Sequence, residues 1–186
     1  MPAVERPVTV DAWLAAIETG DQLVEVVGGA LVSKRVGGNP HHYLARRLAE
    51  EFERQWRGVT ATAPGNWAVE TAGDVIVVGR MPDVLVDGDS LLSDPIFLGV
   101  PDAVVEVWSP SNTLGEMNDK RREYRTAGLP VLVEAFLTDS GDVHLEWLIQ
   151  EGGRWATAGL AVGDTQLSIA DPRPFTVVPN ALLGRR

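Results

Sequence analysis

The chain contains no cysteine among its 186 residues. This absence excludes disulfides, thiolate zinc sites, iron–sulfur clusters and cysteine nucleophiles, and it fits a reducing compartment. No hydrophobic run reaches the ~18 residues that a membrane-spanning helix requires. The first residues also show no basic region followed by a hydrophobic stretch. We therefore expect a cytoplasmic protein without a membrane partner.

Positive charge is scarce as well. The chain has 16 lysine and arginine residues against 26 aspartate and glutamate residues, a net charge of −10. A field of that sign repels nucleic acid, so a role with nucleic acid requires a local basic patch or a metal ion. Two clusters could form such a patch or could be ordinary solvated faces: Lys34, Arg35, Arg46 and Arg47, and Arg121, Arg122 and Arg125.

The familiar loop and metal motifs are also missing. The sequence has no GxxxxGK[ST], GxGxxG, GxSxG or HExxH. Of the three histidines, His41 and His42 are adjacent, so on a helix they cannot form an i, i+4 metal-binding pair. The remaining candidates for chemistry are carboxylates on strands.

What is present is ordinary for a globular protein, with 45% hydrophobic and 23% charged residues. The length predicts one domain over 1–186, with a core at about 8–180. Hydrophobic periodicity and capping residues predict helices near 10–17, from the N-cap Asn39 to about 56, and at 114–127. Two glycines, at 28 and 29, predict a hairpin. Alternating segments between and after these helices predict one mixed sheet with few helices.

Glu106 interrupts the otherwise hydrophobic run Ala103–Trp108. A carboxylate buried in such a strand is costly unless it is paired or binds a metal. Asp102 lies ~13 Å along the same strand, too far away to share an ion with it. Asp83 opens another strand, and if the two strands are neighbours, the two carboxylates can hold Mg²⁺ or Mn²⁺. The alternatives are a salt-bridged or edge-strand Glu106 and an Asp83 that is only a turn residue.

Lys120 is a candidate cation beside this pair. It shares a helical stripe with Met117 and Tyr124, which places it on or beside the inward face. The alternative is a surface ion pair with Glu116, at the favourable i, i+4 spacing.

Several segments together resemble a widespread bacterial family of restriction endonuclease-like proteins in the PD-(D/E)XK nuclease superfamily. The resemblance covers about residues 8–180. It is carried by Pro82-Asp83, by Pro101-Asp102 leading to Glu106 and Ser109-Pro110-Ser111, and by Lys120 with Tyr124 and Gly128. The hairpin after Leu23, the helix after Asn39-Pro40-His41 and the segment Gly152–Trp155 add to it.

The resemblance implies an α+β fold, with a mixed, largely antiparallel sheet flanked by helices. Asp83 and Glu106 match the motif acids that hold the metal. Trp108 stands where the superfamily lysine is expected, and Lys120 matches a lysine carried on the next helix. Glu25 and His41 match supporting polar positions. The sequence departs from the family after Pro130, where an aromatic pair is usual and Val131–Ala135 stands instead.

The function implied is metal-dependent hydrolysis of nucleic acid, more often DNA than RNA, by an endonuclease. Cutting both strands of a duplex would favour a homodimer. The alternative is a catalytically silent module that keeps the nuclease fold for binding or assembly, which the net charge of −10 supports.

Overall fold

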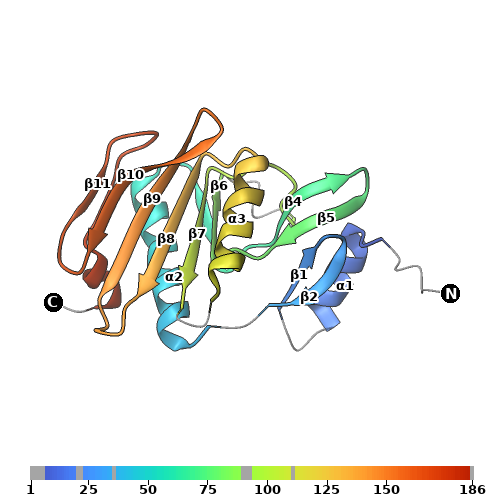
Figure 1. Ribbon diagram of the computed structural model, residues 1–186, viewed down its shortest axis with the longest axis horizontal. Helices are drawn as coiled ribbons and strands as arrows, with labels where there is room; N and C mark the ends of the chain where they lie inside the picture. The colour runs from blue at the N-terminus through green and yellow to red at the C-terminus, as the bar shows by residue number, and fades with distance from the viewer. Residues whose placement is uncertain (1–6, 20–22, 35–36, 89–93, 110–111, 185–186) are drawn as a thin grey trace.

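The computed structural model describes residues 7–19, 23–34, 37–88, 94–109 and 112–184. Its largest part is a six-stranded sheet with helices on both faces (Figure 1). In spatial order the strands are β10 (Arg154–Val162), β9 (Val143–Glu151), β8 (Val131–Leu137), β7 (Ala103–Trp108), β6 (Val84–Asp87) and β3 (Thr60–Thr62). Strands β7 and β8 are parallel, and the other neighbours are antiparallel. The predicted α+β fold with a mixed, largely antiparallel sheet is confirmed.

A second sheet lies beside the first. It has four strands in the order β2 (Ala30–Ser33), β1 (Val24–Val27), β5 (Val75–Arg80) and β4 (Trp67–Ala72). A short pair, β11 (Leu167–Ile169) and β12 (Phe175–Val177), forms a third. The prediction of one sheet is therefore wrong. The chain passes from the second sheet to the first between Arg80 and Val84, where Pro82 cannot donate a ladder hydrogen bond.

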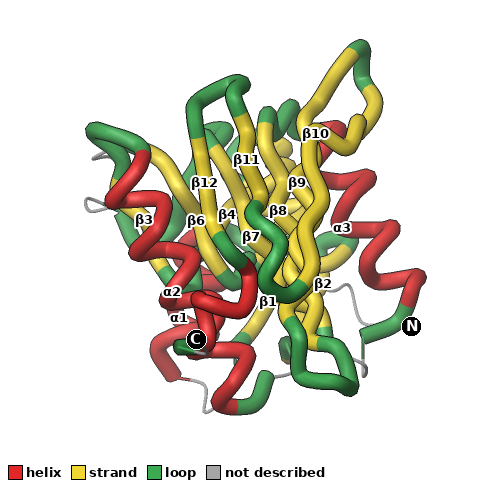
Figure 2. The backbone as a smooth tube through the Cα atoms, turned by 90° about the vertical axis from the view of Figure 1, so that its left-hand side faces the viewer, coloured by secondary structure: helices red, strands yellow, loops and turns green. Residues whose placement is uncertain are grey.

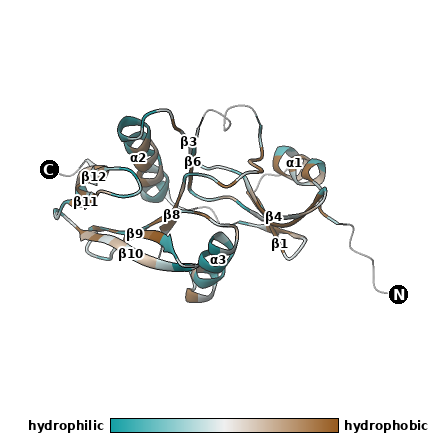
Figure 3. Cartoon of the chain, turned by 90° about the horizontal axis from the view of Figure 1, so that it is seen from above, coloured by the Kyte–Doolittle hydropathy of each residue, from teal (hydrophilic) through white to brown (hydrophobic). Residues whose placement is uncertain are grey.

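The three predicted helices are present as α1 (Val10–Thr19), α2 (Asn39–Gln55) and α3 (Leu114–Thr126). Figure 3 shows α2 and α3 on opposite sides of the main sheet, while α1 covers the second sheet. Gly38, and not Asn39, occupies the N-cap of α2, because Asn39 already has helical geometry. Thr113 caps α3 through a capping box with Glu116. No helix in the described ranges is long and apolar enough to cross a membrane.

The predicted hairpin turn is also confirmed. Gly28 and Gly29 have φ values of 58° and 78°, the left-handed conformation that a two-residue turn between β1 and β2 requires. Three residues used in the sequence interpretation lie outside the described residues: Arg35, Pro110 and Ser111.

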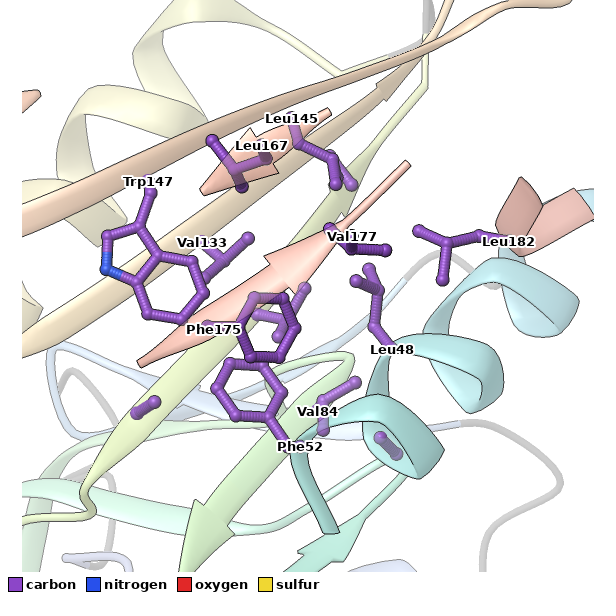
Figure 4. Packing of buried hydrophobic residues seen from close by; sticks show 14 of the residues in the cluster. Leu48, Phe52, Val84, Val133, Leu145, Trp147, Leu167, Phe175, Val177 and Leu182 are labelled. Carbon is purple, nitrogen blue, oxygen red and sulfur yellow. The ribbon is translucent and has the colours of Figure 1, made fainter. Parts of the chain in front are cut away.

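The core between α2 and the main sheet contains an aromatic cluster (Figure 4). Phe52 of α2, Trp147 of β9 and Phe175 of β12 are fully buried or nearly so, with ring centroids 4.9–5.7 Å apart. The sequence predicted no strand in the proline-containing tail that carries Phe175. Figure 2 shows the β11–β12 pair beside the main sheet, and this pair closes the core on the side of α2.

Candidate active site

Asp83 and Glu106 come from neighbouring strands, as predicted. Strands β6 and β7 are antiparallel, with Val84 opposite Val105, and the same register sets Asp83 opposite Glu106. The Val107 N–H donates a hydrogen bond of 2.7 Å to Oδ2 of Asp83. This bond holds Asp83 to β7 just past the last ladder pair, Val84 with Val105. Asp83 directly precedes β6, and its carboxylate contacts His41 of α2, whereas that of Glu106 contacts Lys120 and Tyr124 of α3. Both carboxyl groups line the same pocket, at the point where the two larger sheets meet.

Asp83 is buried and accepts several hydrogen bonds. Its Oδ1 lies 2.9 Å from the ammonium of Lys34 and 3.1 Å from Nε2 of His41. Burial raises the pKa of Asp83, but the hydrogen bond to His41 and the positive charge of Lys34 outweigh it and hold the pKa well below its usual range. Asp83 is thus an ionised carboxylate at neutral pH.

His41 reaches Asp83 from the first turn of α2, on the stripe that also carries Leu44 and Leu48. Gly37 leaves room for the ring, since a Cβ at Gly37 would lie 2.4 Å from Cγ of His41. His41 is therefore a partner of Asp83, and this contact orients the carboxylate.

Glu106 is 2% exposed and lies in the middle of the sheet, so the edge-strand alternative is wrong. Its two oxygens each lie 2.9 Å from the Lys120 ammonium, and Oε1 also accepts from the Tyr124 hydroxyl. Burial raises the pKa of Glu106, and the negative charge of Asp83 adds to this effect against the opposing charge of Lys120. The two acids are thus electrostatically coupled.

Lys120 points at this pair, as predicted. It is 8% exposed and also lies 3.5 Å from Oε1 of Glu25. Burial lowers the pKa of Lys120, but Glu106 and Glu25 outweigh it and raise the pKa, so the ammonium stays charged. The alternative of a surface pair with Glu116 is wrong, because the Glu116 carboxylate bonds to Thr113 at the start of α3.

Glu25 connects the site to the second sheet. Its Oε2 accepts from Arg80 at 2.8 Å and its Oε1 from the Met81 N–H at 3.1 Å. Burial raises the pKa of Glu25, but the charges of Lys120, Arg80 and Lys34 together lower it below its usual value. Arg80 makes two further hydrogen bonds, of 2.7 and 2.9 Å, to Glu123 of α3.

Sequence reasoning missed Arg80 and Glu123, and it treated Lys34 only as a member of a surface patch. The available signal for Arg80 was a charged residue at the end of a hydrophobic strand, directly before Met81-Pro82-Asp83. For Lys34 the available signal was the low number of lysines, because the whole chain contains only two and both lie at this site.

These side chains open onto a pocket of about 310 Å³. The pocket is lined by Asp83, Glu106, Lys34 and Lys120, by the acids Glu116 and Asp119, and by the exposed Val27 and Val32. Asp102, which the spacing excluded, lies elsewhere with Oδ2 3.4 Å from Arg173. The candidate residues Glu25, His41, Asp83, Glu106 and Lys120 are thus brought together.

The donor set fits a hard divalent cation with an incomplete protein shell. No group of three histidine, aspartate or glutamate side chains in the described part of the chain is arranged to hold an ion. Mg²⁺ is commonly bound by one or two carboxylates, with water and substrate phosphates as its other ligands. Two opposed carboxylates at the wall of a pocket match that pattern, although a cationic side chain now bonds to each of them.

Comparison with known proteins gives a similar fold and a family. A structure from Anabaena variabilis ATCC 29413, described as a putative nuclease, has a TM-score of 0.65 and 16% identity, and the match covers 96% of this chain and 98% of that chain. At this identity the likeness shows the fold alone. No curated protein matches the chain. The model of the Uma2 family, described as "Putative restriction endonuclease", matches residues 10–177. The chain therefore belongs to the Uma2 family.

Proposed function

We propose that this protein is a nuclease that hydrolyses phosphodiester bonds of nucleic acid, DNA more readily than RNA. In this proposal Asp83 and Glu106 hold Mg²⁺ or Mn²⁺. The observation that carries it is a pair of opposed, buried carboxyl groups at a pocket, with the ammonium of Lys120 beside them. Membership of the Uma2 family supports a nuclease role.

The chemistry follows from the contacts. A bound divalent cation supplies Lewis-acid stabilisation of negative charge on a phosphate. Lys120 stays charged and lies beside Glu106, so it can stabilise the charge that develops on the phosphate oxygens. His41 and the Val107 N–H fix the orientation of Asp83, and Glu25 holds Lys120 from the other side. Cleavage of both strands of a duplex would favour a two-fold dimer.

A digestion panel tests the proposal. Single- and double-stranded DNA and RNA are incubated with the wild-type protein in Mg²⁺, Mn²⁺ or a chelator, beside D83N and E106Q. The matched control is E151Q, at an exposed glutamate of β9. We expect metal-dependent cleavage by the wild type and E151Q, and a loss of at least about 100-fold in D83N and E106Q. Cleavage that D83N and E106Q retain would remove these residues from the mechanism.

A second candidate function is a binding module without catalysis. It is favoured by the charge of the pocket, because the three lysine and arginine side chains that line it within the described ranges, Lys34, Arg80 and Lys120, pair with carboxylates. Parts of the surface clusters also pair with acids: Arg46 and Arg47 contact Glu50, and Arg122 contacts Asp119. No cleavage of any of the four substrates, with retained binding of one of them by fluorescence anisotropy, would support this function.

A further inference from the structure

Lys34 occupies the carboxylate that the proposed metal needs. We propose that Lys34 is a built-in cation that competes with the divalent ion for Asp83, so that metal binds only when this ammonium leaves the carboxylate. The inference rests on the proposed function, because it takes Asp83 as a metal ligand. It makes Lys34 the residue that sets the metal affinity of the site.

The position of Lys34 is well fixed. It directly follows β2, and its backbone N–H donates to the Leu23 carbonyl at 2.7 Å. Its ammonium donates to Oδ1 of Asp83 at 2.9 Å and to the Met81 carbonyl at 2.5 Å. The side chain is 15% exposed. Two acceptors on the segment that joins the two larger sheets therefore hold the ammonium at the pocket wall.

The hydrogen bonds of Asp83 leave little room for a further cation. A carboxylate offers about four acceptor positions. Lys34 and His41 share Oδ1, and the Val107 N–H uses Oδ2. An ion bound to Asp83 would lie within a few ångströms of the Lys34 ammonium, and two positive charges at that separation repel. The ion and the ammonium therefore exclude one another.

The charge balance of the cluster points the same way. Among the residues that the structure describes, four carboxylates contact three lysine or arginine side chains: Glu25, Asp83, Glu106 and Glu123 contact Lys34, Arg80 and Lys120. The cluster thus has an excess of one negative charge. Without Lys34 the excess is two, which a divalent ion neutralises.

Lys34 is the cation more easily displaced. Lys120 contacts both oxygens of Glu106 and also Glu25, and its side chain is 10% exposed. Lys34 contacts one carboxylate oxygen and the Met81 carbonyl, and its side chain is 15% exposed. An arriving ion therefore removes Lys34 from Asp83 and leaves Lys120 in place.

Isothermal titration calorimetry with Mn²⁺ and Mg²⁺ tests the competition. The proteins are the wild type, K34M, K34R as the matched variant that keeps the charge, and D83N. K34M should bind the ions at least about tenfold more tightly than the wild type, a ratio that corresponds to 1.4 kcal/mol. K34R should resemble the wild type, and D83N should not bind. Circular dichroism establishes that each variant is folded.

The failures of the two proposals are distinguishable. Wild-type binding that depends on Asp83, with an unchanged or weaker affinity in K34M, overturns the role of Lys34 and leaves the proposed metal site standing. No binding by any folded variant, K34M included, overturns the metal site and this inference together.

The two lysines allow a second readout. In a ¹⁵N-lysine-labelled protein, the side-chain ammonium signals arise from Lys34 and Lys120 alone, and K34R assigns them. Saturating Mg²⁺ should move or broaden the Lys34 signal more than that of Lys120, which keeps its contact with Glu25. An unmoved Lys34 signal in a protein that calorimetry shows to be loaded would contradict the displacement.

Discussion

Two glutamates on adjacent strands of the main sheet show how similar surroundings lead to different roles. Glu106 and Glu134 are opposite one another in the parallel β7–β8 ladder, and both are almost completely buried. Consecutive residues of α3 provide their cations: Lys120 bonds to Glu106 and Arg121 to Glu134. Burial and pairing alone therefore do not separate a candidate site residue from a structural one.

The partners of the two carboxylates differ. The guanidinium of Arg121 makes two hydrogen bonds to Glu134 and lies 3.7 Å from Glu146. The backbone carbonyl of Arg121 accepts from the Trp155 indole N–H at 2.8 Å. Lys120 is a single ammonium shared between Glu106 and Glu25. Glu106 also lies opposite a second acid, Asp83, at a pocket wall. A forked guanidinium fixes one geometry, whereas an ammonium between two acids can change partners.

The largest expected effect concerns the structural pair. R121M removes the cation that pairs with the fully buried Glu134. We therefore expect the free energy of unfolding, measured by urea denaturation, to fall by about 3–5 kcal/mol. Metal ions should not change this loss. The control is R122M, because Arg122 is exposed and pairs with Asp119, and we expect a change below about 1 kcal/mol. A loss in R121M no greater than in R122M would show that Glu134 needs no partner.

A smaller effect is expected at the candidate site. E106Q keeps the shape of the side chain and removes the repulsion of Asp83, and Lys120 retains Glu25. We expect the metal-free protein to lose about 1–2 kcal/mol, or roughly 2–8 °C in Tm for a chain of this size. The rise in Tm with millimolar Mn²⁺ should disappear. A loss in E106Q greater than that in R121M would make Glu106 the more important structural residue of the two.

The smallest expected effect is a pH dependence of the unfolding free energy that arises from Asp83. Its pKa lies well below the usual value when the protein is folded, so its contribution to stability is present above the unfolded pKa and is lost as pH falls. The difference in unfolding free energy between the wild type and D83N should therefore shrink by about 1 kcal/mol from pH 7 to pH 3. The control is D102N, at a partly exposed aspartate outside the pocket. An equal difference at both pH values would contradict the lowered pKa.

Much of this arrangement was predictable from local patterns. Glu106 was noticed because a charge interrupted a hydrophobic strand, and Lys120 because it shared a helical stripe with Tyr124. The spacing along one strand excluded Asp102 as a partner of Glu106 at a shared ion. Each of these inferences depends on residues that are near one another in the sequence. The assignment of residues 1–186 to one domain stays a prediction.

The remainder depends on contacts between distant segments. Lys34 and Asp83 are 49 positions apart, and Arg80 and Glu123 are 43 apart. The pattern of a single strand does not reveal which strand lies beside it, so the division into separate sheets was missed. The same limit applies to β12, whose three residues are held mainly by Phe175 in the aromatic cluster.

The junction at Met81–Asp83 has a mechanical consequence. Glu25 belongs to one sheet and Glu106 to the other, and Lys120 spans the space between them. A rotation of one sheet against the other would lengthen one of these two contacts. The position of the Lys120 ammonium therefore depends on how the two sheets are aligned, and a distant substitution that tilts the second sheet would change the pocket through Lys120 and through the contact of Lys34 with Asp83.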